Sequence, residues 1–355
     1  MNNINNVLGN QLILPSLEEI INIDQFKQLT PNEIKLSGTN RVIFLQEEIN
    51  KKIKETLGPI SGVNIYVTGS DGRMESGINL EGSFGSDFIL YFDNISEDDK
   101  TAVISILDNI EKGKDNINFL EIKNIDNIAL YEGGHSQNQN SKNLFFPSRF
   151  IDSNTLFGES GFYDILVKKF IESVKTGIGL KHIRSGGTWT SKIKIHKNIS
   201  ETGKGNRQGK EITHFDLNEG IINFQESRTG GIPTLGIKMG SIRYLQYKLI
   251  YLILKLIENN KIDAQNFGNI GSFTADKIDF VRNFIDGLDE GKIRDLTEAY
   301  YYFLKIHFLL QKQFKEIDKG SVKIELNSNQ KEEFKDVLFT FNSLVKGLTI
   351  RQNLT

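Results

Sequence analysis

The sequence predicts a small mixed α/β unit in the N-terminal half and a mainly helical C-terminal half. Two short runs rich in β-branched and aromatic residues, 63–70 and 87–93, lie between segments with helical apolar spacing. Beyond residue 241, long segments with a helical apolar period dominate. Strands followed by a run of helices favour two units, which we expect to span 1–145 and 146–355.

Local patterns predict each element of the α/β unit. A helix is expected over 41–57, where apolar side chains recur on one face before a Gly-Pro stop. Strands are expected at 63–70, 87–93 and 117–123. A second helix is expected at 96–113, because a serine and a run of acidic residues begin it. Together these elements predict a small mixed sheet with flanking helices.

The C-terminal half is predicted to consist mainly of helices. Apolar residues recur at helical spacing over the segments 159–177, 241–260, 275–287, 292–318 and 330–348. The last two are expected to pair as an antiparallel hairpin. A β- and loop-rich insertion is expected around 185–235, with Trp189 in a strand-like basic stretch. Core packing and stacking on a nucleic-acid base are both open for this tryptophan ring.

Composition limits the classes of function. The net charge is −2, so no overall field draws the chain onto nucleic acid or an anionic membrane. The absence of cysteine excludes disulfides and thiolate zinc sites. The most apolar stretch, 244–257, is too short to span a bilayer, and the N-terminus lacks a signal-peptide pattern. We therefore expect a cytoplasmic protein without a membrane partner, and delivery by a leaderless secretion route stays open.

The segment 67–92, VTGSDGRMESGINLEGSFGSDFILYF, contains the residue types that bind phosphate. Gly69 allows the backbone to approach a ligand, and Ser70 can donate a hydrogen bond to a phosphate oxygen. Arg73 offers a planar fork for phosphate, and Asp87 begins the next strand as a candidate Mg²⁺ ligand. The alternative interpretation is a Gly-rich connection between strands with solvated charges.

The string GSDGRMES, residues 69–76, resembles the G-S-x-G-R-x-E signature of bacterial nucleotidyltransferases related to the PII-uridylyltransferases and glutamine-synthetase adenylyltransferases. The resemblance to this polymerase-beta-like superfamily implies a nucleotidyltransferase fold, a Mg²⁺ or Mn²⁺ cofactor and catalytic roles for Ser70 and Asp87. In the family, two carboxylates on the next strand bind the metal. Asp87 matches the first of them, but Ile89 occupies the second position.

A further carboxylate is needed to complete the metal site that the resemblance implies. Glu75 and Glu81 lie in the connector, and Glu121 lies in the third predicted strand. Asp93 shares the strand face of Asp87 but lies about 20 Å away at ~3.3 Å per residue. We take Glu75 and Glu121 as candidate metal ligands, and the alternative for Glu121 is a solvated strand residue.

Segments of the C-terminal half extend the resemblance over about residues 40–350. FPSRFIDSNTLFGE, 146–159, resembles the family's entry into its helical domain, and GIKMGSIRYLQYKL, 236–249, resembles its Lys-x-Gly segment. The last two predicted helices resemble its closing hairpin. Lys238 and Arg243 are therefore candidate contacts for a triphosphate, and the alternative is a pair of solvated cations at the start of a helix.

Two hypotheses about function follow. The first is a Mg²⁺-dependent nucleotidyltransferase that moves a nucleotidyl group from a nucleoside triphosphate such as ATP to an unknown acceptor, which is a protein, a nucleic acid such as RNA or a small molecule. The second is a relative without catalytic activity that binds a nucleotide or a partner protein as a regulatory module. Ile89 motivates the second hypothesis, because it removes one metal carboxylate.

Overall fold

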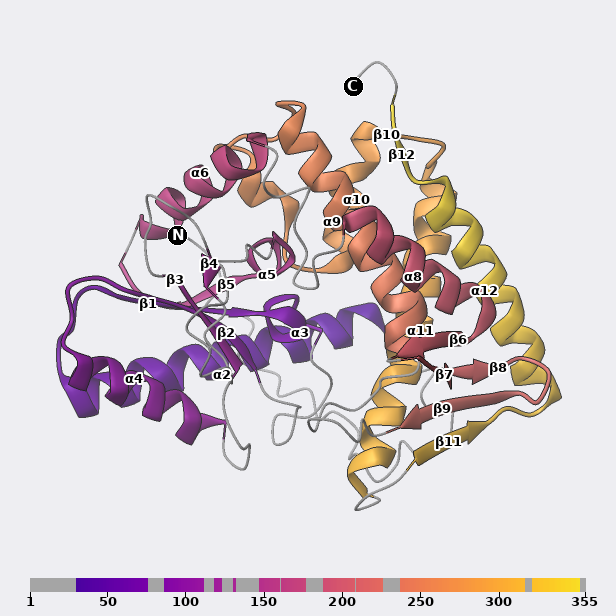
Figure 1. Ribbon diagram of the computed structural model, residues 1–355, viewed down its shortest axis with the longest axis horizontal. Coiled ribbons are helices and arrows are strands. Elements are labelled where there is room, and N and C mark those ends of the chain that lie inside the picture. The colour runs from indigo at the N-terminus through magenta and orange to yellow at the C-terminus, as the bar shows by residue number, and fades with distance from the viewer. Residues whose placement is uncertain are drawn as a thin grey trace.

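The computed structural model has the fold class that the sequence predicts: a mixed α/β structure with a small mixed sheet and a mainly helical C-terminal region (Figure 1). The structure describes residues 30–75, 86–111, 118–122, 130–131, 147–159, 161–176, 188–207, 209–225, 237–316 and 321–351. Glu81, one of the connector carboxylates, lies outside these residues. We call the elements from residue 31 to 175 the sheet unit and those from 189 to 350 the helical unit.

The sheet unit is built on a five-stranded sheet in the order β4-β3-β2-β1-β5. Its strands are β1 (Val63–Thr68), β2 (Asp87–Phe92), β3 (Asn118–Ile122), β4 (Leu130–Tyr131) and β5 (Asn154–Phe157). β2 and β3 run parallel, whereas the other pairs are antiparallel, so the sheet is mixed. β5 lies beyond residue 145 and still pairs with β1, so the sheet takes a strand from the C-terminal side of the expected boundary.

One face of the sheet is covered by α2 (Pro31–Leu57) and α4 (Glu97–Ile110) (Figure 1). Alternate side chains of β1 and β2, such as Val67 and Phe88, pack against these helices in one core cluster. α2 begins at residue 31 rather than 41, because Thr30 and Glu33 form a capping box around its first turn.

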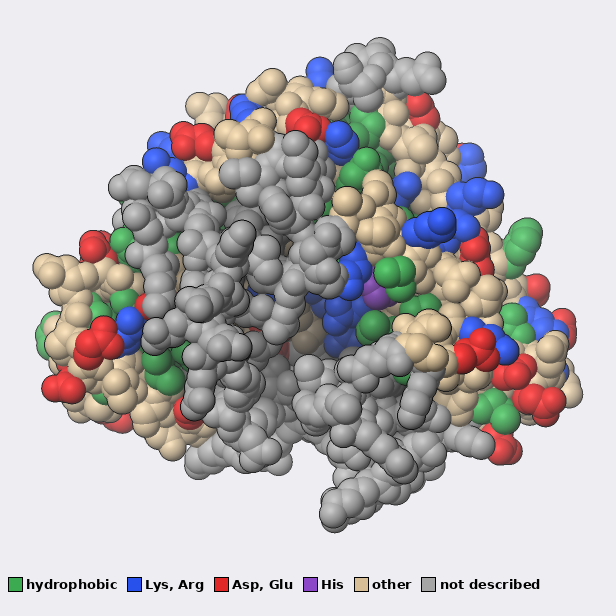
Figure 2. Space-filling model, in the orientation of Figure 1, with side chains coloured by type: hydrophobic (Ala, Val, Ile, Leu, Met, Phe, Trp, Pro, Cys, Tyr) green, Lys and Arg blue, Asp and Glu red, His purple; other side chains and the backbone are tan. Residues whose placement is uncertain are grey.

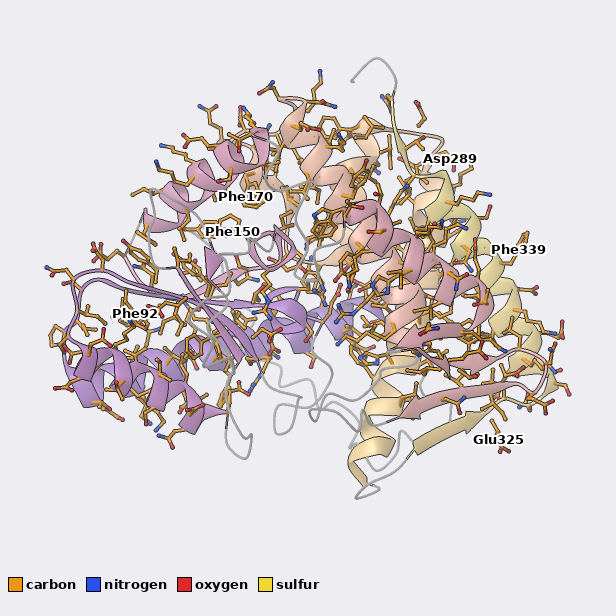
Figure 3. The ribbon with its side chains drawn as sticks, in the orientation of Figure 1. Phe92, Phe150, Phe170, Asp289, Glu325 and Phe339 are labelled. Carbon is orange, nitrogen blue, oxygen red and sulfur yellow. The ribbon has the colours of Figure 1, made fainter. Side chains whose placement is uncertain are left out.

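The opposite face packs on α5 (Pro147–Ile151) and α6 (Phe162–Lys175). Phe150 and Phe170 stack between these two helices with ring centroids 4.7 Å apart (Figure 3). Ile89 is 1% exposed and belongs to the same cluster. The position where the family has a second metal carboxylate is therefore part of the apolar core.

The helical unit surrounds α9 (Arg243–Glu258), whose apolar side chains are mostly buried. Its other helices are α8 (Trp189–Thr202), the π-helical turn η2 (Lys238–Ile242), the 3₁₀ turns η3 (Phe267–Ile270) and η4 (Arg282–Phe284), α10 (Thr274–Val281), α11 (Glu290–Glu316) and α12 (Ser328–Gly347). α11 and α12 lie side by side and antiparallel, as predicted (Figure 1). Phe339 projects from α12 and is 79% exposed (Figure 3).

The predicted insertion around 185–235 contains both a helix and strands. The prediction of a strand-like stretch around Trp189 was wrong, because Thr188 and Ser191 form a capping box that begins α8. Short strands follow: β6 (Lys204–Arg207), β7 (Lys210–Thr213), β8 (Phe215–Asp216) and β9 (Ile221–Gln225). β9 pairs with β8 and with β11 (Ser321–Glu325), while β10 (Ile285–Asp286) pairs with β12 (Thr349–Ile350).

Within the described part of the chain, no helix has the length and apolarity that crossing a membrane requires.

Candidate functional site

The end of β1 and the start of β2 form one corner. Thr68 lies opposite Asp87 in the antiparallel register, and the short helix α3 (Gly69–Gly72) follows Thr68 directly. Gly69 has a φ of +71°, and a Cβ at this position would lie 2.9 Å from Oδ2 of Asp87. A side chain at position 69 would therefore displace the carboxylate, and glycine lets the two segments meet. The Gly-Ser pair and the aspartate are neighbours in space.

A small pocket lies beside this corner, between the sheet unit and the helical unit. It is lined by Ser70, Arg73, Glu75, Lys238, Ile242, Gln246, Leu304 and His307, and its volume is about 10 Å³. Figure 2 shows a hollow in the middle of the molecule where Lys and Arg side chains gather beside a histidine. Ser70 from the sheet unit and Lys238 from the helical unit thus line one pocket, although they lie far apart in the sequence.

Lys238 is half-buried and begins the π-helical turn η2, a form that often occurs at functional sites. Burial, together with the positive charges of Arg243 and Arg73, lowers the pKa of Lys238 to about 7, against the opposing effect of Asp87 and Asp71. Its ammonium group therefore lies where a further negative charge would be stabilising. An anion in the pocket would supply that charge.

Arg243 and Arg149 place two further cations near the corner. Arg243 lies close enough to Lys238 to lower its pKa, and the Nε of Arg243 has no hydrogen-bond partner among the described residues. A guanidinium nitrogen of Arg149 lies 4.0 Å from Asp87, whose side chain remains 34% exposed. The corner thus presents one accessible carboxylate among several cations.

Arg73 and Glu75 are held in a buried charge network. Arg73 pairs with Glu75 at 3.2 Å and with Asp152 at 2.7 Å, and Asp152 in turn lies 3.1 Å from the Nζ of Lys277. The Glu75 carboxylate also accepts hydrogen bonds from Tyr300 at 2.7 Å and from both the backbone and side chain of Thr274.

This network, which we call the joint, links the sheet unit to α10 and α11. The predicted phosphate contact Arg73 and the predicted metal ligand Glu75 each line the pocket, but their charged groups already have partners in the joint. A structural role accounts for both side chains. Neither needs a ligand to satisfy its charge.

Glu121 lies on the other side of the sheet from Asp87. It pairs in register with Leu90, whose side chain packs on the α2 and α4 face, whereas Asp87 shares the face of Ile89. Its carboxylate lies 2.9 Å from Lys100 of α4. No group of three His, Cys, Asp or Glu side chains suited to a metal occurs among the residues that the structure describes. Of the predicted metal ligands that the structure describes, Asp87 lies at the corner itself, where a guanidinium nitrogen of Arg149 is 4.0 Å away.

A second buried cluster of polar side chains lies next to the corner. The Ser86 hydroxyl lies 2.6 Å from Asp71 and 2.7 Å from Glu111, and Arg41 of α2 lies 2.7 Å from the same Glu111 oxygen. Asp71 follows Ser70 and Ser86 precedes Asp87, so this cluster fixes both segments of the corner. Sequence reasoning missed it because its members come from four separate segments.

His307 is the other functional candidate that sequence reasoning missed. It lines the pocket from α11, is 3% exposed, and its Nδ1 has no hydrogen-bond partner among the described residues. Burial and the charges of Lys238 and Arg243 hold the pKa of His307 well below its usual range, so the imidazole is neutral. An unsatisfied buried donor or acceptor costs about 1–3 kcal/mol. The only sequence signal was a histidine within an apolar helix.

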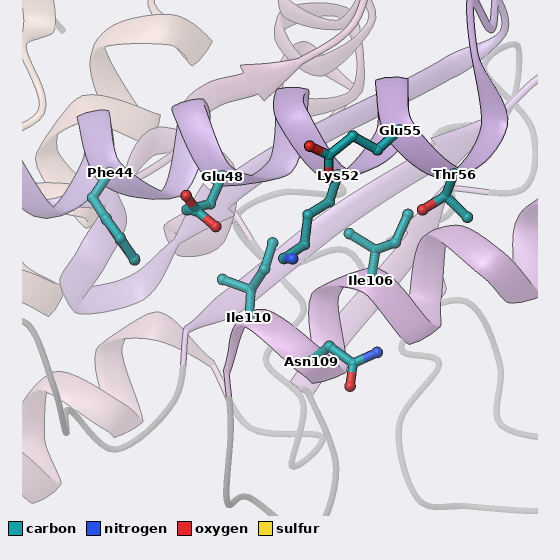
Figure 4. Close-up of a pocket in the computed structure, with 8 residues that line it drawn as sticks. All are labelled: Phe44, Glu48, Lys52, Glu55, Thr56, Ile106, Asn109 and Ile110. Atoms are coloured by element: carbon teal, nitrogen blue, oxygen red, sulfur yellow. The ribbon is translucent and has the colours of Figure 1, made fainter.

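A larger groove lies between α2 and α4, on the face of the sheet away from Asp87. Its volume is about 520 Å³, and Lys52 extends across it from α2 toward α4 (Figure 4). Its lining combines Glu48, Glu55 and Lys52 with apolar side chains such as Ile110. Charges of both signs line this groove without a convergent set, so we place the candidate site at the corner.

Comparison with known proteins adds no family: no family model matches the chain, and no curated protein matches it.

Proposed function

We propose that this protein binds the polyphosphate of a nucleoside triphosphate at the corner of Gly69, Ser70 and Asp87. The observation that carries the proposal is the position of Lys238, which comes from the helical unit and lines the same pocket as Ser70. The mixed sheet, with Asp87 opposite the end of β1, also fits the nucleotidyltransferase-type fold that the motif implies.

The charges of the site favour a phosphate ligand. The low pKa of Lys238 follows from burial and from the nearby guanidinium groups, and the negative charge of a phosphate would offset both effects. Ser70 can donate to a phosphate oxygen, and Arg243 has an Nε without a partner among the described residues. The cations of the helical unit thus complement the Gly-Ser corner of the sheet unit.

Binding without transfer is the function that the geometry supports best. A metal at this corner could be bound by the carboxylate of Asp87. The other two positions do not contribute, because Ile89 is part of the core and Glu121 points to the other face of the sheet. Mg²⁺ is usually held by one or two carboxylates together with substrate phosphates. One carboxylate is the lower limit of that range, so a regulatory nucleotide-binding module is our first proposal.

Calorimetric titration with ATP, GTP, CTP and UTP tests this proposal. We expect one of them to bind, and we expect Lys238→Met to weaken binding by about tenfold or more, because a charge-assisted hydrogen bond is lost. Lys255→Met is the matched control, since Lys255 lies on α9, which follows η2 directly, but pairs with Glu258 at 2.5 Å. Failure of all four nucleotides to bind the wild-type protein would refute the proposal.

A second candidate function, Mg²⁺- or Mn²⁺-dependent nucleotidyl transfer, is favoured by the accessible carboxylate of Asp87 next to Ser70. Asp87 would hold the metal, which would offset the charge of the phosphates. An acceptor hydroxyl would form a bond to the α-phosphorus while the bond to pyrophosphate breaks. The hydroxyl proton would pass to a carboxylate oxygen of Asp87, and Lys238 and Arg243 would bind the departing pyrophosphate.

Labelled nucleoside triphosphate, incubated with the protein, Mn²⁺ and a cell extract, distinguishes the two candidates. Transfer predicts label in a protein, nucleic acid or small molecule, and predicts that Asp87→Asn abolishes this label while nucleotide binding persists. Binding of the nucleotide with no label in any fraction would leave the regulatory module as the function.

A further inference from the structure

The pocket beside Ser70 ends against the helical unit. Its volume of about 10 Å³ is enough for roughly one water molecule or one ligand oxygen atom. A space of this size admits the end of a ligand and not its middle. Because Lys238 lines it and Arg243 lies near, the end of the ligand that enters is anionic.

His307 lines this pocket with a nitrogen that lacks a protein partner. The side chain is 3% exposed, and no described residue forms a hydrogen bond with its Nδ1. Most buried polar atoms in proteins are satisfied, and an exception is commonly explained by a water, an ion or a ligand. Gln246, another lining residue, is already bonded to Tyr300 at 2.9 Å. His307 therefore has hydrogen-bonding capacity that the described part of the fold does not use.

We propose that His307 is a specificity-determining residue whose Nδ1 binds an oxygen of the terminal phosphate, so that the protein distinguishes a nucleoside triphosphate from the diphosphate. This inference rests on the proposed nucleotide binding and adds to it the part of the ligand that is recognised. Ser70 lines the pocket and adjoins Gly69, so a phosphate chain that passes Asp87 at the corner ends in the pocket. A diphosphate bound at the same corner is one phosphate shorter and leaves Nδ1 unpaired.

The charges around His307 agree with this assignment. Lys238 and Arg243 face the imidazole, and Glu75 lines the same pocket but is bonded to Arg73, Thr274 and Tyr300. A neutral imidazole can donate one hydrogen bond to an anion without adding another positive charge to the pocket. Leucine at this position would remove that donor and keep a similar apolar volume.

Calorimetry on the full chain tests the proposal with the nucleotide that binds wild type most tightly and with its diphosphate. We expect wild type to prefer the triphosphate, and we expect His307→Leu to lower this preference about tenfold while the diphosphate affinity stays unchanged. His307→Asn keeps an amide donor near the position of Nδ1 and should retain most of the preference. His214→Leu is the matched control, because His214 is 4% exposed and lies outside the pocket lining.

Nitrogen NMR of wild type with labelled histidine provides a test that needs no variant to fold. The triphosphate should shift the Nδ1 resonance of His307, and the diphosphate should not. An unchanged preference in His307→Leu, equal losses for both nucleotides, or an Nδ1 resonance that ignores the triphosphate would each overturn the assignment and leave nucleotide binding standing. If no nucleotide binds wild type, the proposed function and this inference fall together.

Discussion

The joint and the pocket share Arg73 and Glu75, yet they bury charge in opposite ways. In the joint, the cations Arg73 and Lys277 face the carboxylates Glu75 and Asp152 at 2.7–3.2 Å. In the pocket, burial and neighbouring cations lower the pKa of Lys238 to about 7, and an imidazole nitrogen has no partner among the described residues.

This difference distinguishes groups with a structural role from groups with a binding role within one interface. Buried charges that are paired hold the two units together and need no ligand. Buried groups that stay unsatisfied reduce stability, so their presence favours a ligand that satisfies them. The motif residues fall into the same two groups. Arg73 and Glu75 belong to the joint, whereas Ser70 and Asp87 lie beside the unsatisfied groups of the pocket.

Asp152→Ala should have the largest effect on stability, because it leaves Arg73 and Lys277 buried without their shared partner. Removing one partner of a buried pair costs about 3–5 kcal/mol, which urea unfolding would measure. Asp276→Ala is the control, since the Lys35–Asp276 pair also links the two units but has side chains 49% and 38% exposed. That loss should stay below about 1 kcal/mol. Equal losses would remove the distinction between the joint and the surface.

Lysine-to-methionine substitutions should have opposite signs in the two regions. Lys277→Met breaks the joint and should destabilise the protein, whereas Lys238→Met should stabilise it by up to about 4 kcal/mol at pH 7. The sign follows because the pKa of Lys238 falls from 10.5 in the unfolded chain to about 7 in the fold. The folded state therefore disfavours the charged form of Lys238. The resulting loss of stability is fully present below pH 7 and disappears above pH 10.5.

Thermal unfolding from pH 6 to pH 10 checks this sign. The gain from Lys238→Met should shrink as the pH rises, because wild-type Lys238 then loses its charge in the unfolded chain too. A destabilised Lys238→Met variant at pH 7 would place Lys238 with the structural residues of the joint.

Nucleotide affinity should depend on pH through the same lysine. A phosphate binds the protonated form of Lys238, whose pKa in the free protein is about 7. Affinity should therefore be greatest below pH 7 and should fall by up to about tenfold for each pH unit above it, until the raised pKa of the bound state is passed. Calorimetry at several pH values measures this slope. Lys238→Met should bind weakly with little pH dependence, and an identical slope in that variant would assign the titration to another group.

Local patterns in the sequence predicted three of the five strands, β1, β2 and β3, and placed Gly69 and Asp87 at the end of one strand and the start of the next, whereas β4 and β5 were not predicted. A strand that ends in Gly-Ser and a second that begins with Asp must bring those ends together if they pair as antiparallel neighbours. The helix at Trp189 was missed because its evidence is a capping box, Thr188 with Ser191, whereas the alternating basic residues suggested a strand.

The partners of the motif residues could not be predicted, because they come from distant segments. Thr274 and Tyr300 reach Glu75 only through the packing of the two units, and Asp152 reaches Arg73 through the folding of the sheet unit. The motif alone therefore assigns Arg73 to phosphate and Glu75 to metal, while the fold gives both a structural partner. Glu121 shows the same limit, since its face depends on the register of β3 against β2.

Gly69→Ala should have the smallest effect on stability and still change the site. Its φ of +71° strains an alanine by about 1 kcal/mol, and the new Cβ would lie 2.9 Å from the Asp87 carboxylate. Gly161→Ala is the control, because Gly161 has a φ of +87° with no atom within 4 Å of the added Cβ. Both variants should lose similar stability in urea, but only Gly69→Ala should weaken nucleotide binding. Unaltered binding in Gly69→Ala would mean that the ligand does not depend on the placement of Asp87, and the corner would then belong with the joint as a purely structural region.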